Sequence, residues 1–143
     1  MFMINDGLKL KGKLAISLNG KIVQEVDNLV VTAGKGYVAS RIKDASATAM
    51  SHMAIGSGST AAAASDTALG SQLGRVALTS TTVSSAVVTY VASFPAGTGT
   101  GAVTEAGILN ASSGGTMLCR TVFSVVNKGA SDSMTVTWTV TVS

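Results

Sequence analysis

The chain has 143 residues and a net charge of +3; 46% of its residues are hydrophobic and only 12% are charged. This length favours one domain with one hydrophobic core, whereas the charged fraction is about half that of ordinary soluble domains. Because no stretch of about 20 predominantly apolar residues occurs, the sequence excludes a transmembrane helix. The lone Cys119 excludes an internal disulfide.

The N-terminal part of the chain begins with a strand pattern. Residues 1–6 show no basic region followed by an apolar run, so no signal peptide is expected. In residues 8–18, leucine or isoleucine occupies every second position except 12, which is the period of a half-buried strand. This pattern places Lys9, Lys11 and Lys13 together on the opposite face.

A hairpin turn is predicted at Asn19 and Gly20, because both central residues of a type I′ turn need positive φ. The return strand, 21–26, is less regular. A two-residue loop would place Glu25 opposite Leu14, whereas a three-residue loop with a bulge repairs some pairs and spoils others. The register of this hairpin stays open.

Two short helices are expected in the following segment. Residues 27–28 predict a turn and 29–32 a short extended segment. The glycines of 34–36 then open a helix over 37–44. After a strand at 50–55, Ser65 and Asp66 are typical of a helix start, and this second helix would run towards residue 73.

From Arg75 onwards the pattern is that of strands. Residues 95–102 and 127–132 are expected to be loops, and 110–115 a turn between two strands of a hairpin. The predicted strands are 75–79, 82–94 (one bent strand or two), 103–109, 116–123 and 134–142.

The last of these strands alternates apolar residues with threonines without interruption, and Trp138 lies at the centre of its apolar face. The free energy gained by burying this face is about equal to the entropic cost of ordering the strand. The strand therefore requires sheet neighbours and a second apolar layer. The expected fold is therefore all-β, a jelly-roll-like antiparallel β-sandwich of about eight strands with one or two short helices in the connections. One domain would span 1–143, with a hairpin at 8–26, helix-containing connections at 35–74 and the main strands at 75–142.

Few residues suit catalysis or metal binding. His52 has no second histidine to complete a site, and Cys119 is expected to be a buried, inert thiol. Glu105 lies inside a predicted strand, where pairing with Arg120 across the hairpin is favoured over an acid in a cleft. The glycine-rich runs at 34–36, 56–58 and 97–101 do not match phosphate or dinucleotide motifs. We therefore expect no enzyme, no catalytic residue, no metal and no cofactor.

The lysine stripe Lys9, Lys11 and Lys13 is the one candidate binding surface. Lysines also protect strand edges, so a solvated stripe is one interpretation and contact with an acidic protein surface is the other. No aromatic residues interleave with the lysines, which argues against nucleic acid. The low overall charge favours a subunit whose faces become covered in an assembly.

Several segments resemble structural proteins of tailed bacteriophages, most closely the head cement (decoration) proteins. The resemblance covers residues 28–142 and rests on the segments 28–42, 52–60, 63–70, 73–75, 104–110, 120–123, 127–129 and 135–140.

This resemblance implies a jelly-roll protein that is made in the host cytoplasm and binds the outside of the virion head. The implied partners are the major capsid protein and a second copy of the chain, as a homodimer rather than a trimer, with no direct nucleic acid and no membrane. Two alternatives stay open. One is a tail or receptor-binding subunit, and the other is a carbohydrate-binding module using Trp138, Tyr37 and Tyr90 for stacking.

Overall fold

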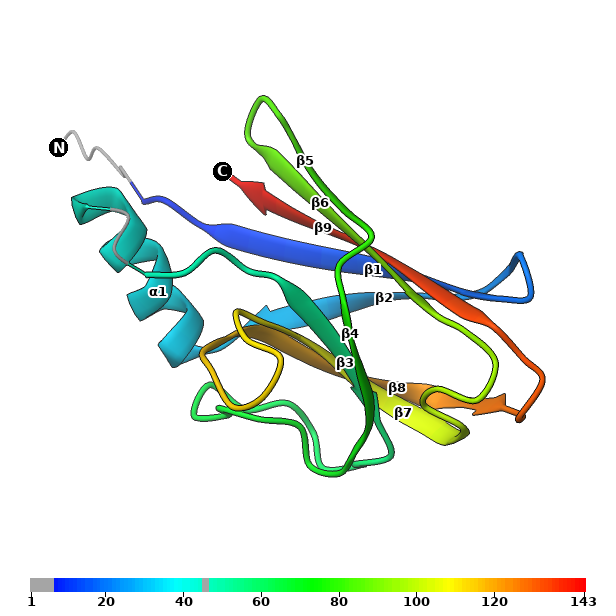
Figure 1. Cartoon of the computed structure of the whole chain (residues 1–143). Coiled ribbons are helices and arrows are strands. Elements are labelled where there is room, and N and C mark those ends of the chain that lie inside the picture. Colours follow the sequence, from blue (N-terminus) through cyan, green and yellow to red (C-terminus); the bar gives the residue numbers. More distant parts are fainter. Residues whose placement is uncertain (1–6, 45–46) are drawn as a thin grey trace, which may run out of the picture.

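In the computed structural model of this chain, residues 7–44 and 47–143 are described, and the signal-peptide expectation for 1–6 lies outside them. The described residues form nine strands and one helix (Figure 1). The elements are β1 (Leu10–Leu18), β2 (Lys21–Val30), α1 (Thr32–Lys43), β3 (His52–Gly56), β4 (Gln72–Ala77), β5 (Ser80–Ser84), β6 (Val87–Phe94), β7 (Gly101–Leu109), β8 (Met117–Lys128) and β9 (Met134–Val142).

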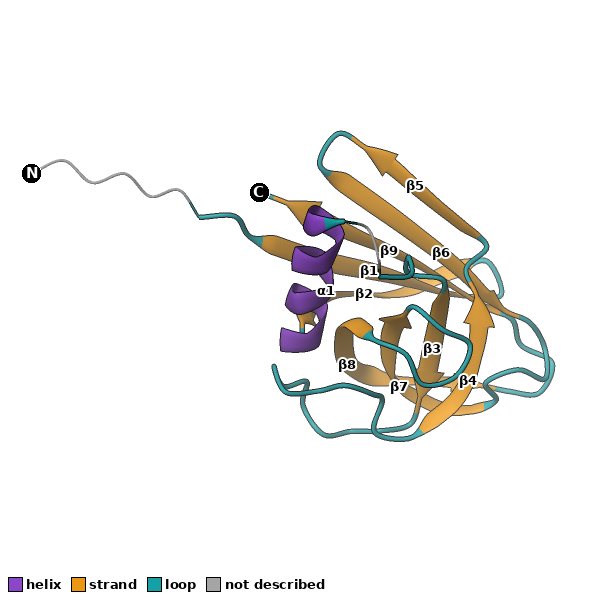
Figure 2. Ribbon diagram, turned by 60° about the vertical axis from the view of Figure 1, so that its left-hand side comes forward, coloured by secondary structure: helices purple, strands orange, loops and turns teal. Residues whose placement is uncertain are grey.

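The strands form one continuous antiparallel sheet in the order β4-β3-β7-β8-β2-β1-β9-β6-β5. Strand β2 joins the two halves, because it pairs with β1 up to Asn28 and with β8 at Leu29 and Val30. The sheet curls, so that β1, β9, β6 and β5 lie over β8, β7, β3 and β4, with α1 at one end (Figure 2). The all-β prediction is confirmed, while a jelly roll in particular stays a prediction.

The core lies between the two halves, and β9 supplies much of it as its alternation predicts. Trp138 is fully buried on the inner face, and the threonines of β9 are only partly buried on the outer face. The other inner-face residues that are almost completely buried include Leu14, Ile16, Met53, Ile55, Phe94, Ile108, Met134 and Val136.

The β1–β2 hairpin resolves its register with a tight turn followed by a bulge. Asn19 and Gly20 have φ of 50° and 82°, as the turn prediction requires. The pairing shifts by one residue at Val23, so that Glu25 lies opposite Ala15 and not opposite a core leucine. The bulge thereby moves a carboxylate off the buried face.

The predicted turn at 27–28 is wrong, because β2 continues through it to Val30. The indole Nε1 of Trp138 donates a hydrogen bond to Asn28 Oδ1 at 3.1 Å, so this asparagine serves a distant tryptophan. Gly12 lies opposite Asn28, and a Cβ there would come within 1.6 Å of Asn28 Oδ1. Glycine is therefore required beneath the amide.

The helix predicted at 37–44 exists but begins earlier, at Thr32, and includes the glycines of 34–36. Gly34 is buried against the backbone of β8, where a Cβ would come within 2.1 Å of the Leu118 carbonyl oxygen. The glycine thus allows close approach of the helix to the sheet and does not interrupt the helix.

The helix predicted from Ser65 to residue 73 is wrong. Asp66 instead closes a turn, in which its carboxylate accepts the Ala63 N–H at 2.9 Å, and Gln72 already belongs to β4. A helix start and a turn of this kind have the same local sequence signal, because in both an aspartate side chain accepts hydrogen bonds from nearby backbone N–H groups.

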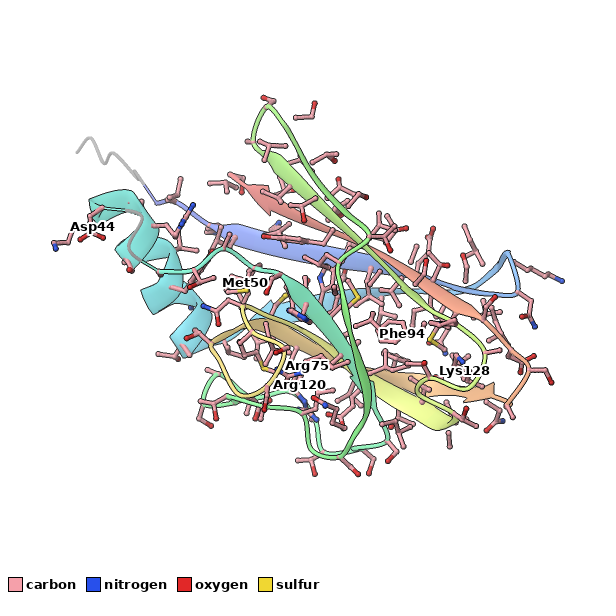
Figure 3. All side chains as sticks on the ribbon, viewed as in Figure 1. Asp44, Met50, Arg75, Phe94, Arg120 and Lys128 are labelled. Carbon is pink, nitrogen blue, oxygen red and sulfur yellow. The ribbon has the colours of Figure 1, made fainter. Side chains whose placement is uncertain are left out.

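For the segment 82–94 the sequence predicts one bent strand or two, and the structure has two. They are β5 and β6, separated by a turn with Ser85 at φ 53°. Strand β8 extends to Lys128, which the sequence places in a loop. Lys128 is buried near Phe94, at the far end from α1 (Figure 3), and its Nζ donates to the Pro95 and Asp132 carbonyls at 2.9 and 2.7 Å.

Candidate functional site

A buried ionic cluster, defined as Glu105, Arg120 and Asp66, lies on the outer side of the β7–β8 pair. The Arg120 Nη2 is 3.0 Å from Glu105 Oε1, and its Nη1 is 2.8 Å from Asp66 Oδ2. The side chain of Glu105 is 0% exposed and that of Arg120 is 3% exposed. Figure 3 shows Arg120 on the side of the sheet where the loop 57–71 lies. The predicted Glu105–Arg120 pair is confirmed, and Asp66 joins it from a segment that the sequence assigns to a helix.

Backbone N–H groups complete the surroundings of Glu105. Its carboxylate accepts hydrogen bonds from Gly58, Gly70 and Ser71 at 2.6, 2.7 and 2.8 Å. A Cβ on Gly58 would lie 2.3 Å from Glu105 Oε2, so the loop reaches the carboxylate because glycine is present. Arg120 Nη2 also donates to the Thr60 carbonyl at 3.0 Å.

These donors determine the protonation of the cluster. Burial raises the pKa of Glu105, but the N–H groups of Ser71, Gly70 and Gly58 together with Arg120 outweigh burial, so its pKa is lowered. The Ala63 N–H and Arg120 likewise lower the pKa of Asp66. Glu105 is therefore an enclosed carboxylate that fastens the loop 57–71 to the sheet. The acid-in-a-cleft interpretation does not fit a side chain with this degree of burial.

A second charged region, the basic groove, lies where β1 begins beside α1. It is a hollow of about 370 Å³ lined by Leu8, Lys9, Leu10, Lys11 and Lys35. Within the described part of the chain, its three lysines form no ion pair.

Lys13 does not belong to the groove. Its ammonium lies 3.8 Å from Glu25 on the exposed face of the β1–β2 hairpin. Of the predicted lysine stripe, Lys9 and Lys11 therefore line the groove together with Lys35. Lys13 lies outside the groove. The sequence could not show Lys35 as a partner, because the meeting of α1 with β1 depends on the path of β2 between them.

A second hollow of about 370 Å³ continues the basic groove inwards along β1, and we call it the inner hollow. It is lined by Leu10, Lys11, Gly12, Asp27 and Asn28. The Asn28 amide has a defined orientation, because the indole N–H of Trp138 can only donate and therefore faces Oδ1. Its Nδ2 is buried and has no hydrogen-bond partner among the described residues.

The other candidate residues lie apart from both regions. His52 is a half-buried residue of β3 whose Nδ1 is 2.8 Å from the hydroxyl of Ser51. Cys119 is fully buried, as expected, and burial raises the pKa of its thiol. No group of three or more metal-ligating side chains is found in residues 7–44 and 47–143. The helix in those ranges, α1, is too short to span a membrane.

Two of the three aromatic residues considered for carbohydrate stacking are buried. Trp138 is 0% exposed, and Tyr90 lies beside it on β6 at 8%. Burial raises the pKa of Tyr90 to about 12, with smaller contributions from Tyr37 and Cys119. Tyr37 alone of the three is partly exposed, and one such ring does not make a stacking platform.

No protein-family model, curated protein or solved structure matches this chain. Of the two charged regions described above, the ionic cluster satisfies its own groups, whereas the basic groove presents cations to the surroundings. The groove is therefore the candidate functional site.

Proposed function

We propose that this chain is a structural protein of a tailed-bacteriophage virion that binds the outer surface of the head and stabilises the major capsid protein lattice. The proposal rests on the resemblance of residues 28–142 to cement proteins and on the chemistry of the basic groove. The observation that carries it is an exposed groove with three lysines that no carboxylate of the described residues neutralises. Such a surface complements an acidic protein face.

Low charge supports the same proposal. Residues 76–104, which include β5 and β6, carry no charged side chain. A freely diffusing protein normally keeps charges across its surface, whereas faces that become covered in an assembly dispense with them.

A second copy of the chain is the other partner that we propose, at the open edge of β5. This strand ends the sheet; all five of its residues are exposed, and Val83 is 71% exposed. On the opposite edge strand, β4, the loop before β7 covers one face, since Gly74 packs on Gly99. An uncharged open edge is a template for pairing with another strand, which fits a homodimer.

Lysine in place of Val83 should therefore weaken self-association, because a charge on an edge opposes edge-to-edge pairing. We expect wild-type protein to have the mass of a dimer in light scattering and V83K to have the mass of a monomer. Thr81→Lys, on the same strand, serves as a second edge variant. Dimers of unchanged stability in both variants would place the self-interface elsewhere.

Imaging of virions tests the proposed function. In electron micrographs of purified virions that carry this chain, we expect density of its shape on the outer surface of the head lattice. Density confined to the tail would contradict the proposal and favour the tail or receptor-binding alternative. A glycan array tests the carbohydrate alternative, for which the burial of Trp138 and Tyr90 predicts no binding.

A further inference from the structure

The basic groove lies at a fork in the sheet. Strand β1 pairs with β9 from Leu10 onwards, but its ladder with β2 begins only at the Gly12–Asn28 pair. The fork forms because β2 leaves β1 at Leu29 to pair with β8. The basic groove and the inner hollow occupy the two ends of this fork and share Leu10 and Lys11.

The start of β1 consequently has an open edge. Lys9 exchanges two backbone hydrogen bonds with Ser143, at 2.7 and 2.8 Å. Because backbone groups alternate in direction along an antiparallel strand, the N–H and C=O of Leu10 point away from β9, to the side that β2 leaves. On that side Leu10 has no ladder partner within the described residues. This edge can therefore accept another strand.

Charge complementarity indicates what the added strand contains. Lys9 and Lys11 are two residues apart on β1, and Lys35 faces the same hollow from the first turn of α1. An extended chain presents alternate side chains about 7 Å apart on one face, which equals the spacing of the two lysines. Acidic residues at alternate positions would thus meet Lys9 and Lys11 in register.

The inner hollow supplies a hydrogen-bond donor, and its own carboxylate restricts where acidic residues of the added strand can lie. The Nδ2 of Asn28 is a buried donor that has no partner in the described part of the chain, and a carbonyl oxygen at the fork would satisfy it. Asp27 lines the same hollow, so acidic side chains belong at the outer end, beside the three lysines. Leu8 and Leu10 give the groove apolar walls, which suits apolar residues between the acidic ones.

We propose that the fork binds an extended acidic protein segment, which adds to the edge of β1 and places its carboxylates on Lys9, Lys11 and Lys35. Identification of this segment as part of the major capsid protein rests on the proposed function, but the binding chemistry does not. Nucleic acid is not favoured, because no aromatic side chain among residues 7–44 and 47–143 lines either hollow.

The binding test is a nuclear magnetic resonance titration of the isotope-labelled full chain with a short peptide that alternates glutamate and valine. We expect saturable shifts at the Leu10 amide, the Asn28 side-chain amide and Lys35, with slower hydrogen exchange at Leu10. The K11S/K35S double variant should bind the peptide about fivefold to tenfold more weakly, since each exposed ion pair contributes modestly. Lys13→Ser, on the same strand but paired with Glu25, should bind like wild type.

Several results would overturn the inference. One is the absence of shifts at the fork; another is a glutamine–valine peptide that binds equally well. Shifts at the lysines without protection of Leu10 would refute strand addition, and tighter binding of a single-stranded oligonucleotide at the fork would refute a protein ligand.

The inference and the proposed function can fail separately. Peptide binding at the fork together with tail-only density in virions would contradict the capsid proposal and leave the fork site standing. Head density together with no peptide binding would do the reverse.

Discussion

The buried ionic cluster and the basic groove place the same kinds of charged side chain in opposite situations. In the cluster, Glu105 accepts three backbone hydrogen bonds in addition to its contact with Arg120. In the groove, Lys9 and Lys11 extend from an open strand edge without a carboxylate partner among the described residues. The two regions therefore differ in whether their charged groups have partners within the described residues. Groups whose bonds are complete hold a loop, and groups whose bonds are incomplete are available to a partner.

The largest expected effect is on the cluster. Arg120→Leu should cost about 3–5 kcal/mol in the free energy of unfolding, because it leaves Glu105 as a buried charge without its cationic partner. The loop 57–71 should also become accessible to hydrogen exchange. Urea denaturation measures the free energy. Lys13→Ser is the control, since its exposed pair with Glu25 should contribute at most about 1 kcal/mol. A loss in R120L no larger than in K13S would refute a structural role for the cluster.

A smaller loss is expected at the pair of Gly12 and Asn28. Gly12→Ala should cost about 1–3 kcal/mol, because the added methyl displaces the Asn28 amide and breaks its bond with the buried Trp138 indole. Thermal unfolding and Trp138 fluorescence report the two consequences. Gly36→Ala in α1 is the matched control, since nothing lies within 4 Å of the added Cβ. That variant should be neutral or slightly stabilising. Equal stability of both variants would contradict the close approach at Gly12.

The pH dependence of stability is a further property of the cluster. A carboxylate whose folded-state pKa is lowered stabilises the fold above its unfolded pKa, and this contribution is lost as pH falls through the lower, folded value. Stability should therefore decline as pH falls below about 4.5, the ordinary value for Glu105. Glu105→Gln should flatten this part of the profile, as measured by unfolding at a series of pH values. A profile with the same slope in wild type and E105Q would mean that Glu105 does not contribute.

The smallest effect on stability is expected in the groove. The variant in which Lys9, Lys11 and Lys35 are all serine should unfold within about 0.5 kcal/mol of wild type, because exposed side chains without partners contribute little. Urea denaturation checks this value. A loss comparable to that of R120L would show that the groove is part of the framework, contrary to the comparison above.

The sequence predicted those parts of the fold whose signals are local or strictly periodic. The alternation of 134–142 identified β9 and its buried face, and Asn19-Gly20 identified a tight hairpin turn. The Glu105–Arg120 pair was predictable because the two residues face each other across one hairpin. Charge within an otherwise uncharged strand was the signal, and it proved sufficient.

The errors arose where a local signal has a distant partner. Asparagine after aspartate at 27–28 is typical of a turn, but the hydrogen-bond partner of Asn28 is Trp138, which is 110 residues away in the sequence. Asp66 is of a residue type that is common at the start of a helix, but its carboxylate binds Arg120 on β8. The bulge at Val23 and the meeting of Lys35 with β1 depend on how whole strands pair. No pattern within a short window contains that information.

The basic groove itself illustrates the same limit. The sequence indicated Lys9, Lys11 and Lys13 because they share a strand face, whereas in the structure Lys35, and not Lys13, lines the groove with Lys9 and Lys11. The backbone direction at Leu10 and the Asn28 Nδ2, which has no hydrogen-bond partner among the described residues, are further features that side-chain types cannot reveal.

A competition experiment tests most directly whether the groove, and not the cluster, carries binding. Equal amounts of wild-type chain and the triple serine variant at Lys9, Lys11 and Lys35 would be mixed with purified capsid shells that lack the chain, and mass spectrometry would give the bound ratio. We predict that bound protein is mostly wild type at low salt, and that the preference declines as salt screens the charges. Equal amounts of the two chains on the shells would contradict this account.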